Sequence, residues 1–173
     1  MIENNTVYFA PAIPFADVNF EVPAVADQLQ ARLEGWYLRP AEECMERSQL
    51  FAATTLLLSG VEFWARLHGS DSVSLVKRLP SFRSVATELW DRFRCGLAHE
   101  GRIKAGDCVS IEASAPSGEG RIVVDPRLLL NAFRQRVRDD VDAIRCNPKL
   151  VSTTLKRWFA KDFELAGRQG RAR

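Results

Sequence analysis

The most constraining feature of the sequence is its longest apolar run, LFAATTLLLSGVEFWARL, at residues 50–67. Apolar side chains recur there at helical spacing and form a broad stripe: Phe51, Leu57, Leu58, Val61, Trp64, Ala65 and Leu67. A helix that is apolar around so much of its circumference needs neighbours on several sides. The run therefore predicts the central helix of a bundle, spanning residues 41–67 and ended by Gly69.

Helical patterns on both sides of this run predict its neighbours. Further helices are expected at residues 23–38, 81–98, 125–145 and 147–163. The first should end at Arg39, because the residue before a proline disfavours the helical region. The strand-like stretches CVSIEA and RIVVD predict a small β-hairpin near 108–125. The expected fold class is all-α, a bundle of about five helices with a small β-hairpin insertion.

Three segments are expected along the chain. Residues 1–22 contain Pro11, Pro14 and several aromatic residues, which predicts an extended arm that packs on its own core or on a partner. Residues 23–165 are expected to form a single helical domain, since 173 residues suffice for one core. Residues 166–173 are expected to form a basic, flexible tail.

Composition excludes few functions but favours a cytoplasmic protein. The net charge of +2 says little about partners. The 4 cysteines and 2 histidines lack the spacing of metal sites or of a disulfide framework, so we expect no metal and no cofactor. No signal peptide is evident. Ser59, Gly60, Glu62 and Arg66 interrupt the apolar run, so we expect no membrane span.

The stretch RFRCGLAHEGRIK, at residues 92–104, has two interpretations. In the first, Gly101 ends a helix, and the cations near it are favoured by the helix dipole. In the second, the stretch is a reactive site. His99 would transfer a proton, and Arg94 would hold a phosphate and stabilise charge that develops on it. Cleavage of RNA by its own 2′-hydroxyl needs this proton transfer and this stabilisation of charge, and it needs no metal.

The spacing of Arg94 and His99 restricts the helix geometries in which the two side chains can act together. Residues five apart on a straight α-helix point roughly 140° away from each other. The two side chains share a face only if the helix is locally irregular or ends near Gly96. Two copies of the motif brought together by a two-fold axis are the other solution.

The segment RCGLAH, from Arg94 to His99, resembles the R-x4-6-H motif of the HEPN superfamily. Its place late in a long helix, after another apolar helix, is similar to that family as well. The resemblance implies an all-α homodimer with both motifs in a shared cleft. It also implies metal-independent endoribonuclease activity of the toxin–antitoxin or defence type, with RNA and an antitoxin or other protein as partners. His99 would transfer the proton, and Arg94 would contact the phosphate.

Two positions depart from the family pattern. The residue after the motif arginine is often Asn, Asp or His in active members, and here it is Cys95. The position at which some members carry a modifiable tyrosine is Ile103. Because other members are inactive, a non-catalytic dimerisation or binding module is the alternative function.

Several residues are candidates to support the motif. Glu62 could orient Arg94 or His99, or it could lie in water at the edge of the apolar stripe. Ser59 is a candidate of the same kind. Arg92, Arg102 and Lys104 could contact the phosphate backbone of RNA, or they could form an ordinary surface balanced by Asp91 and Glu100.

Overall fold

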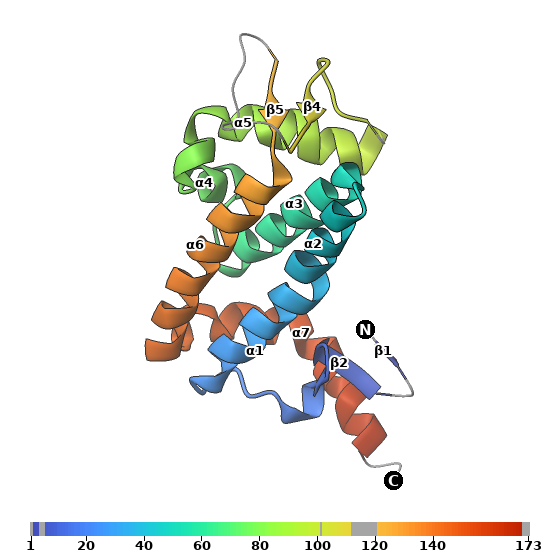
Figure 1. Cartoon of the computed structure of the whole chain (residues 1–173). Coiled ribbons are helices and arrows are strands. Elements are labelled where there is room, and N and C mark those ends of the chain that lie inside the picture. Colours follow the sequence, from blue (N-terminus) through green and yellow to red (C-terminus); the bar gives the residue numbers. More distant parts are fainter. Residues whose placement is uncertain (1, 4–5, 101, 112–120, 171–173) are drawn as a thin grey trace. The chain divides into compact units, whose positions relative to one another are not determined.

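The structure, a computed structural model, describes residues 2–3, 6–100, 102–111 and 121–170, with side chains at 6–97, 102–111 and 121–166. The chain forms two compact units. The first joins Met1–Trp36 to Val137–Arg173, and the second is Tyr37–Arg136. Helices dominate both units (Figure 1), which confirms the predicted all-α class with a small β insertion. Each unit is described by itself, and the domain limits 23–165 stay a prediction.

The first unit begins with a small antiparallel sheet. Strands β1 (Ile2–Glu3) and β3 (Ile13–Pro14) both pair with β2 (Thr6–Ala10), and a 3₁₀ turn, η1 (Phe15–Asp17), follows. Helix α1 (Ala24–Leu33) packs against β2, and helix α7 (Lys149–Gly170) packs against β2 and η1. The segment predicted as an extended arm thus packs on its own unit. Residues 171–173 of the predicted tail lie outside the described residues.

An aromatic cluster forms the core of this unit. Its members are Phe9, Phe15 and Phe20 from the N-terminal segment and Phe159 and Phe163 from α7, with ring centroids between 5.1 and 6.2 Å apart. These separations are typical of favourable edge-to-face contacts.

Arg32 is stacked among aromatic rings beside this cluster. Its guanidinium carbon lies 4.2 Å from the ring centroid of Trp36, 4.9 Å from that of Phe159 and 5.1 Å from that of Phe9. Its Nη1 also donates to the carbonyl of Phe9. Cation–π contacts and a charge-assisted hydrogen bond therefore tie the N-terminal strands to α1 and α7.

The second unit contains most of the short helices. They are α2 (Arg39–Glu46), α3 (Leu50–Leu67), α4 (Ser72–Lys77), the 3₁₀ helix η3 (Pro80–Val85), α5 (Ala86–Glu88) and the π-helix η4 (Leu89–Glu100). Strands β4 (Cys108–Val109) and β5 (Val123–Val124) follow, and α6 (Pro126–Cys146) contributes its first half.

The predicted β insertion near 108–125 is present, but its two strands run parallel and not antiparallel as in the predicted hairpin. Cys108 pairs with Val123, and Val109 pairs with Val124. Parallel strands cannot be joined by the tight turn of a hairpin and need a longer connection. Residues 112–120 of this connection lie outside the described residues.

Helix α3 is the centre of the second unit, as the apolar run predicts. Leu57, Leu58 and Trp64 are fully buried, and α2, α4, η4 and β4 all contact the helix. Gly60 permits a close approach, since a Cβ there would lie 3.1 Å from Cβ of Tyr37 and 3.3 Å from the ring of Phe133.

The prediction of one helix over residues 41–67 is wrong, because the chain breaks at Ser48. Ser48 has a φ of 57°, and α2 and α3 lie on either side of it. The Gln49 N–H bonds the Cys44 carbonyl at 2.7 Å, and the Ser48 N–H bonds the Met45 carbonyl at 3.0 Å. These two bonds form a Schellman motif with serine at the position that usually requires glycine. Phe51, expected on the apolar face, is 46% exposed in the first turn of α3.

The predicted helix end at Arg39 is also wrong, because helical winding continues through Pro40. Pro40 has no N–H with which to bond the carbonyl four residues earlier. The preceding segment is wound as a π-helix, η2 (Glu34–Leu38), which changes the bonding pattern just before the proline. The proline therefore falls in the first turn of α2, where its missing donor is tolerated.

Other helix boundaries follow from local signals. Gly69, with a φ of 65°, ends α3 in a second Schellman motif, as predicted. Asp125 caps α6 by accepting the Arg127 N–H at 2.8 Å. Helix α4 was not predicted, although its N-cap Asp71 accepts the Ser74 N–H at 2.8 Å. The hydrogen bonds from Ser74 lower the pKa of Asp71.

Replacing Ser48 with glycine is expected to raise the free energy of unfolding by about 1 kcal/mol, because glycine adopts positive φ without a Cβ clash. Gly69→Ser, at the equivalent position of the second Schellman motif, is expected to lower it by a similar amount. Thermal or denaturant unfolding of both variants measures these changes. An unchanged stability of Ser48→Gly would contradict this account of the break.

Candidate functional site

The predicted motif lies on η4, which is wound as a π-helix from Leu89 to Glu100. In a π-helix each N–H bonds the carbonyl five residues earlier, so backbone positions 94 and 99 lie about one turn apart. The irregularity that the spacing demands is therefore present, as a widening of the helix. The side chain of His99 lies outside the described residues, and its role stays a prediction.

Arg94 is held by Glu62 of α3. Its Nε and Nη2 donate to Oε2 of Glu62 at 3.0 and 2.6 Å. The other oxygen of Glu62, Oε1, lies 2.6 Å from Nη2 of Arg66, one turn later on α3. Two guanidinium groups thus share one carboxylate, and the trio keeps a net positive charge.

Partial burial strengthens this ion pair. Only 21% of the Arg94 side chain and 19% of the Glu62 side chain are exposed, so water screens them less than it screens a surface pair. Such a cluster can hold an anion through charge-assisted hydrogen bonds, for which a guanidinium is well suited. Ser59 lies half-buried on α3, one turn before Glu62, and its side chain makes no hydrogen bond with the side chain of Glu62 or Arg94.

Gly96 lets the chain fold back along η4 after the helix ends. The Arg102 N–H bonds the Gly96 carbonyl at 3.2 Å, and the Lys104 N–H bonds the Arg92 carbonyl at 3.1 Å. A Cβ at Gly96 would lie 2.4 Å from the carbonyl oxygen of Arg102, closer than real contacts permit. The glycine of the motif therefore has a structural role. Gly101, expected to end the helix, lies outside the described residues.

The predicted RNA-binding cations differ in their surroundings. Nη1 of Arg92 lies 3.4 Å from Oδ2 of buried Asp107, whose Oδ1 accepts the Ile122 N–H at 2.7 Å. Arg92 thus contacts the carboxylate that fixes the chain next to β5. Lys104 Nζ lies 4.0 Å from Asp91, and Arg102 is exposed. The structure brings Arg92, Arg102 and Lys104 to one side of η4 through the returning chain.

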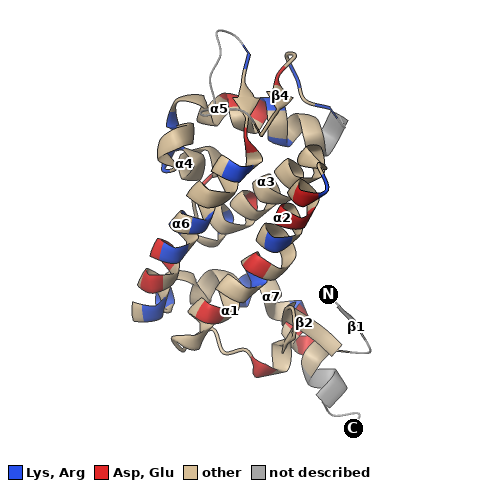
Figure 2. Cartoon of the chain, in the orientation of Figure 1, with Lys and Arg blue, Asp and Glu red and all other residues tan. Residues whose placement is uncertain are grey.

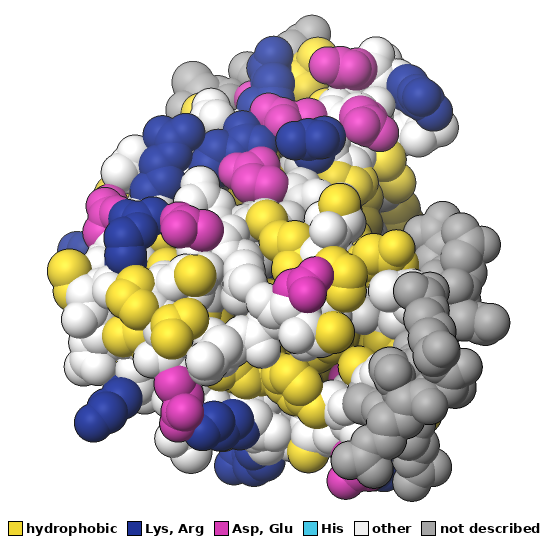
Figure 3. All heavy atoms as spheres, turned by 90° about the horizontal axis from the view of Figure 1, so that it is seen from below, with side chains coloured by type: hydrophobic (Ala, Val, Ile, Leu, Met, Phe, Trp, Pro, Cys, Tyr) yellow, Lys and Arg dark blue, Asp and Glu magenta, His cyan; other side chains and the backbone are white. Residues whose placement is uncertain are grey.

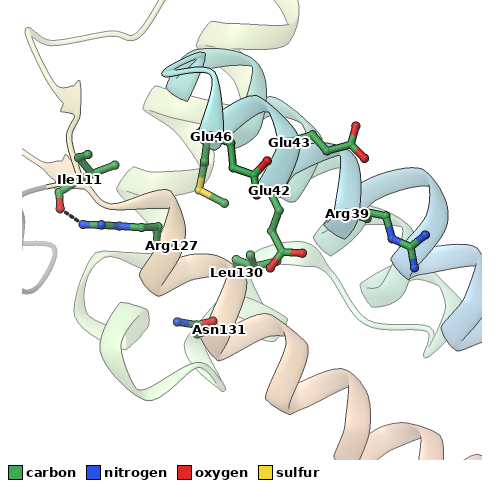
Figure 4. A pocket seen from close by; sticks show the side chains of 9 residues that line it. Arg39, Glu42, Glu43, Glu46, Ile111, Arg127, Leu130 and Asn131 are labelled. Atoms are coloured by element: carbon green, nitrogen blue, oxygen red, sulfur yellow. Dashed lines mark hydrogen bonds between the residues drawn. The ribbon is translucent and has the colours of Figure 1, made fainter.

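A separate pocket of about 750 Å³ lies in the second unit, between α2, the start of α6 and Ile111 (Figure 4). None of the predicted site residues lines it. Glu42 on its wall bonds Arg134 through both oxygens at 2.9 Å, and these bonds lower the pKa of Glu42. Arg127 points to Ile111 and donates to its carbonyl (Figure 4). Two of the charged residues that line the pocket, Glu42 and Arg127, are thus engaged by neighbouring groups.

The surface carries charges of both signs in close proximity. Figure 2 shows acidic and basic positions side by side along α6, and Figure 3 shows cationic and anionic side chains intermixed on one face. Arg145, for example, lies 2.7 Å from Asp27 and 2.6 Å from Asp142. Phosphate binding would therefore have to come from local clusters such as the one at Arg94.

The described residues carry few features of a metal site or of a membrane-spanning segment. Among the described residues, no group of three or more His, Cys, Asp or Glu side chains could hold a metal ion. Within the same part of the chain, α3 alone is long and apolar enough to cross a membrane, with a mean hydropathy of 1.3. Half of it is buried inside the structure, as in the core helix of a soluble protein.

Sequence reasoning missed two residues that shape this region. Asp107 is a buried carboxylate with two partners, and no local pattern marks it. Trp90 is the second of these residues, and its ring centroid lies 5.9 Å from the guanidinium carbon of Arg94. The sequence could have predicted this contact, since Trp90 precedes Arg94 by four residues and side chains four apart on a helix lie next to each other.

Gly96→Ala is expected to lower the free energy of unfolding by about 1–3 kcal/mol, because the new methyl group must displace the Arg102 carbonyl. Thermal unfolding measures the change. Thr87→Ala, at an exposed position of α5, serves as the control and should shift stability by less than about 0.5 kcal/mol. Equal stability of Gly96→Ala and wild type would contradict the close approach.

A double-mutant cycle of Glu62→Gln and Arg94→Gln is expected to give a coupling energy of about 1–2 kcal/mol, since the pair is bidentate and partly buried. The matched control is the exposed pair Asp142 and Arg145, for which about 0.3–0.5 kcal/mol is expected. Denaturant unfolding of the single and double variants supplies both values. A coupling at Glu62–Arg94 no larger than the control would contradict the proposed anchoring.

Comparisons with known proteins do not assign the chain to a family. No protein-family model matches the sequence, and neither a curated protein nor a solved structure is significantly similar to it.

Proposed function

We propose that the chain is a HEPN-like, metal-independent endoribonuclease that acts as a homodimer. The observation that carries the proposal is the position and charge of the Arg94 guanidinium. Its guanidinium is fixed by Glu62, keeps positive charge in its surroundings and lies on a helix whose winding sets backbone positions 94 and 99 one turn apart. A fixed cation one turn from a histidine is the arrangement that phosphodiester cleavage requires.

In the proposed reaction, the imidazole of His99 takes the proton of a ribose 2′-hydroxyl. The 2′ oxygen attacks the adjacent phosphorus, and the bond from phosphorus to the 5′ oxygen breaks. The 5′ oxygen receives a proton, so the products are a 2′,3′-cyclic phosphate and a 5′-hydroxyl. Arg94 stabilises the negative charge that develops on the phosphoryl oxygens, and Glu62 keeps its guanidinium in position.

The surroundings of the motif supply contacts to RNA in this proposal. Arg102 and Lys104, on the chain that returns along η4, contact the phosphate backbone, and Arg92 adds positive charge beside them. Dimerisation about a two-fold axis brings two motifs into one cleft. We further propose a cytoplasmic location, and an antitoxin or other protein partner that restrains the activity.

A non-catalytic dimerisation or binding module is the second candidate function, and Cys95 favours it. A cysteine follows the motif arginine, where active members of the superfamily often carry a better hydrogen-bonding residue. In this alternative the Glu62–Arg94 pair only joins α3 to η4, and the dimer binds a protein partner without cleaving RNA.

His99→Ala is expected to reduce RNA cleavage by at least about 100-fold, because loss of general acid–base catalysis typically costs that much. The assay is cleavage of labelled mixed-sequence RNA by the purified protein in EDTA, with the product ends identified. His68→Gln, which changes the other histidine of the chain, is the matched control and should retain activity.

Two outcomes of this assay test the nuclease, and a separate light-scattering measurement tests both candidates. Cleavage that is lost in His99→Ala and retained in His68→Gln supports the nuclease. Equal cleavage by His99→Ala and wild type would falsify the assignment of His99. A monomer at micromolar concentration, measured by light scattering, would contradict both candidates because each needs the paired surface.

A further inference from the structure

We propose that Trp90 and Arg94 together form a binding site for one nucleotide of a single-stranded RNA, with the base stacked on the indole and the phosphate held by the guanidinium. This inference rests on the proposed function and deepens it, since it assigns to Trp90 a role in positioning the substrate. Trp90 and Arg94 lie one turn apart on η4, with the guanidinium carbon 5.9 Å from the ring centroid.

The geometry of Arg94 leaves one edge of the guanidinium for a ligand. Nε and Nη2 both point to Glu62, whereas Nη1 has no partner among the residues that the structure describes. Because Glu62 also binds Arg66, its single negative charge is divided between two cations. The electrostatic balance at Nη1 therefore favours an anion, and a phosphate oxygen accepts from a guanidinium with good geometry.

The indole of Trp90 supplies the second half of the site. Trp90 is half-buried, so the residue is partly packed in the unit and partly accessible to solvent. The contact with Arg94 is at the outer limit of a cation–π interaction, so the guanidinium does not cover the whole ring face. A partly accessible aromatic side chain next to a cation that can bind phosphate is the combination with which proteins hold single-stranded nucleic acids.

The separation of the two groups fits one nucleotide. The ribose lies between a base and its own phosphate, and its width is of the same order as the distance between the Trp90 ring and the Arg94 guanidinium. Every nucleobase has a π-face, so stacking on Trp90 requires a base but tolerates many sequences. The site would therefore hold the RNA in register at the motif without selecting a sequence.

The other tryptophans do not offer this combination. Trp64 is fully buried, and Trp36 is covered by the guanidinium of Arg32. Trp158 is half-buried on α7, in the first unit, and has no described contact with Arg94. Trp158 is therefore a matched control for the loss of a half-buried indole.

The test compares two short probes by fluorescence anisotropy. One is a mixed-sequence 2′-O-methyl oligoribonucleotide, which lacks the attacking hydroxyl and so cannot be cleaved by the proposed mechanism. The other is its abasic equivalent, which keeps the phosphates. Trp90→Leu is expected to weaken binding of the first probe by about 5- to 150-fold, the usual effect of losing one stacked base, and to leave binding of the abasic probe unchanged. Trp90→Phe should retain most of the affinity, and Trp158→Leu should retain all of it.

Arg94→Gln provides the complementary result and should weaken binding of both probes equally. Equal weakening of both probes by Trp90→Leu, or no weakening of either, would overturn the assignment of Trp90. Absence of binding by the wild type would overturn the site altogether. Base-dependent binding through Trp90 without cleavage of any RNA would support the site and contradict only the nuclease.

A second measurement needs no destabilising variant. Tryptophan fluorescence of the wild type should be quenched more by the base-containing probe than by the abasic probe. This difference should disappear in Trp90→Phe, which keeps an aromatic ring in the helix. Persistence of the difference in Trp90→Phe would assign the quenching to another tryptophan and overturn the proposal.

Discussion

The burial of α3 is the constraint on which the second unit depends. Each fully buried leucine or tryptophan of this helix contributes roughly 1.5–3 kcal/mol or more through the area it removes from water. Surrounding the helix with neighbours also removes most of the Glu62 side chain from bulk water, and a carboxylate so placed is costly unless it is paired. Glu62 therefore needs partners, and Arg94 and Arg66 supply them. The packing that stabilises the unit thus also fixes the guanidinium of the candidate site.

Helix η4 takes part in the same packing. Leu89, Phe93 and Leu97, at intervals of four residues, are buried, so one face of η4 packs into the core of the unit. A π-helix is uncommon and is often found at functional positions. In this protein the π winding places the backbone positions 90, 94 and 99 on one side of η4. Gly96 allows the chain that follows η4 to bring Arg102 and Lys104 next to the helix. The proposed substrate-binding residues and the residues with structural roles therefore lie within a few turns of one helix.

The predictions from sequence were right where a local signal determines the structure. Gly69 ends α3 because glycine tolerates positive φ, and Asp125 with Pro126 begins α6 because their chemistry suits a helix N-terminus. They were wrong at Ser48 and Pro40, where a serine occupies a glycine-like position and a proline is accommodated by π winding. At both positions the surrounding packing outweighed the local preference.

The sequence by itself determined the all-α class, the central place of residues 50–67 and the motif spacing that an ordinary helix cannot accommodate on one face. These properties depend on hydrophobic periodicity and on residues close together in the chain. Only the tertiary structure decided the pairing of Glu62 with Arg94, the parallel pairing of β4 with β5 and the contact of Arg92 with Asp107. Each joins residues distant in sequence, and no local preference specifies which buried charge or strand edge will meet which partner.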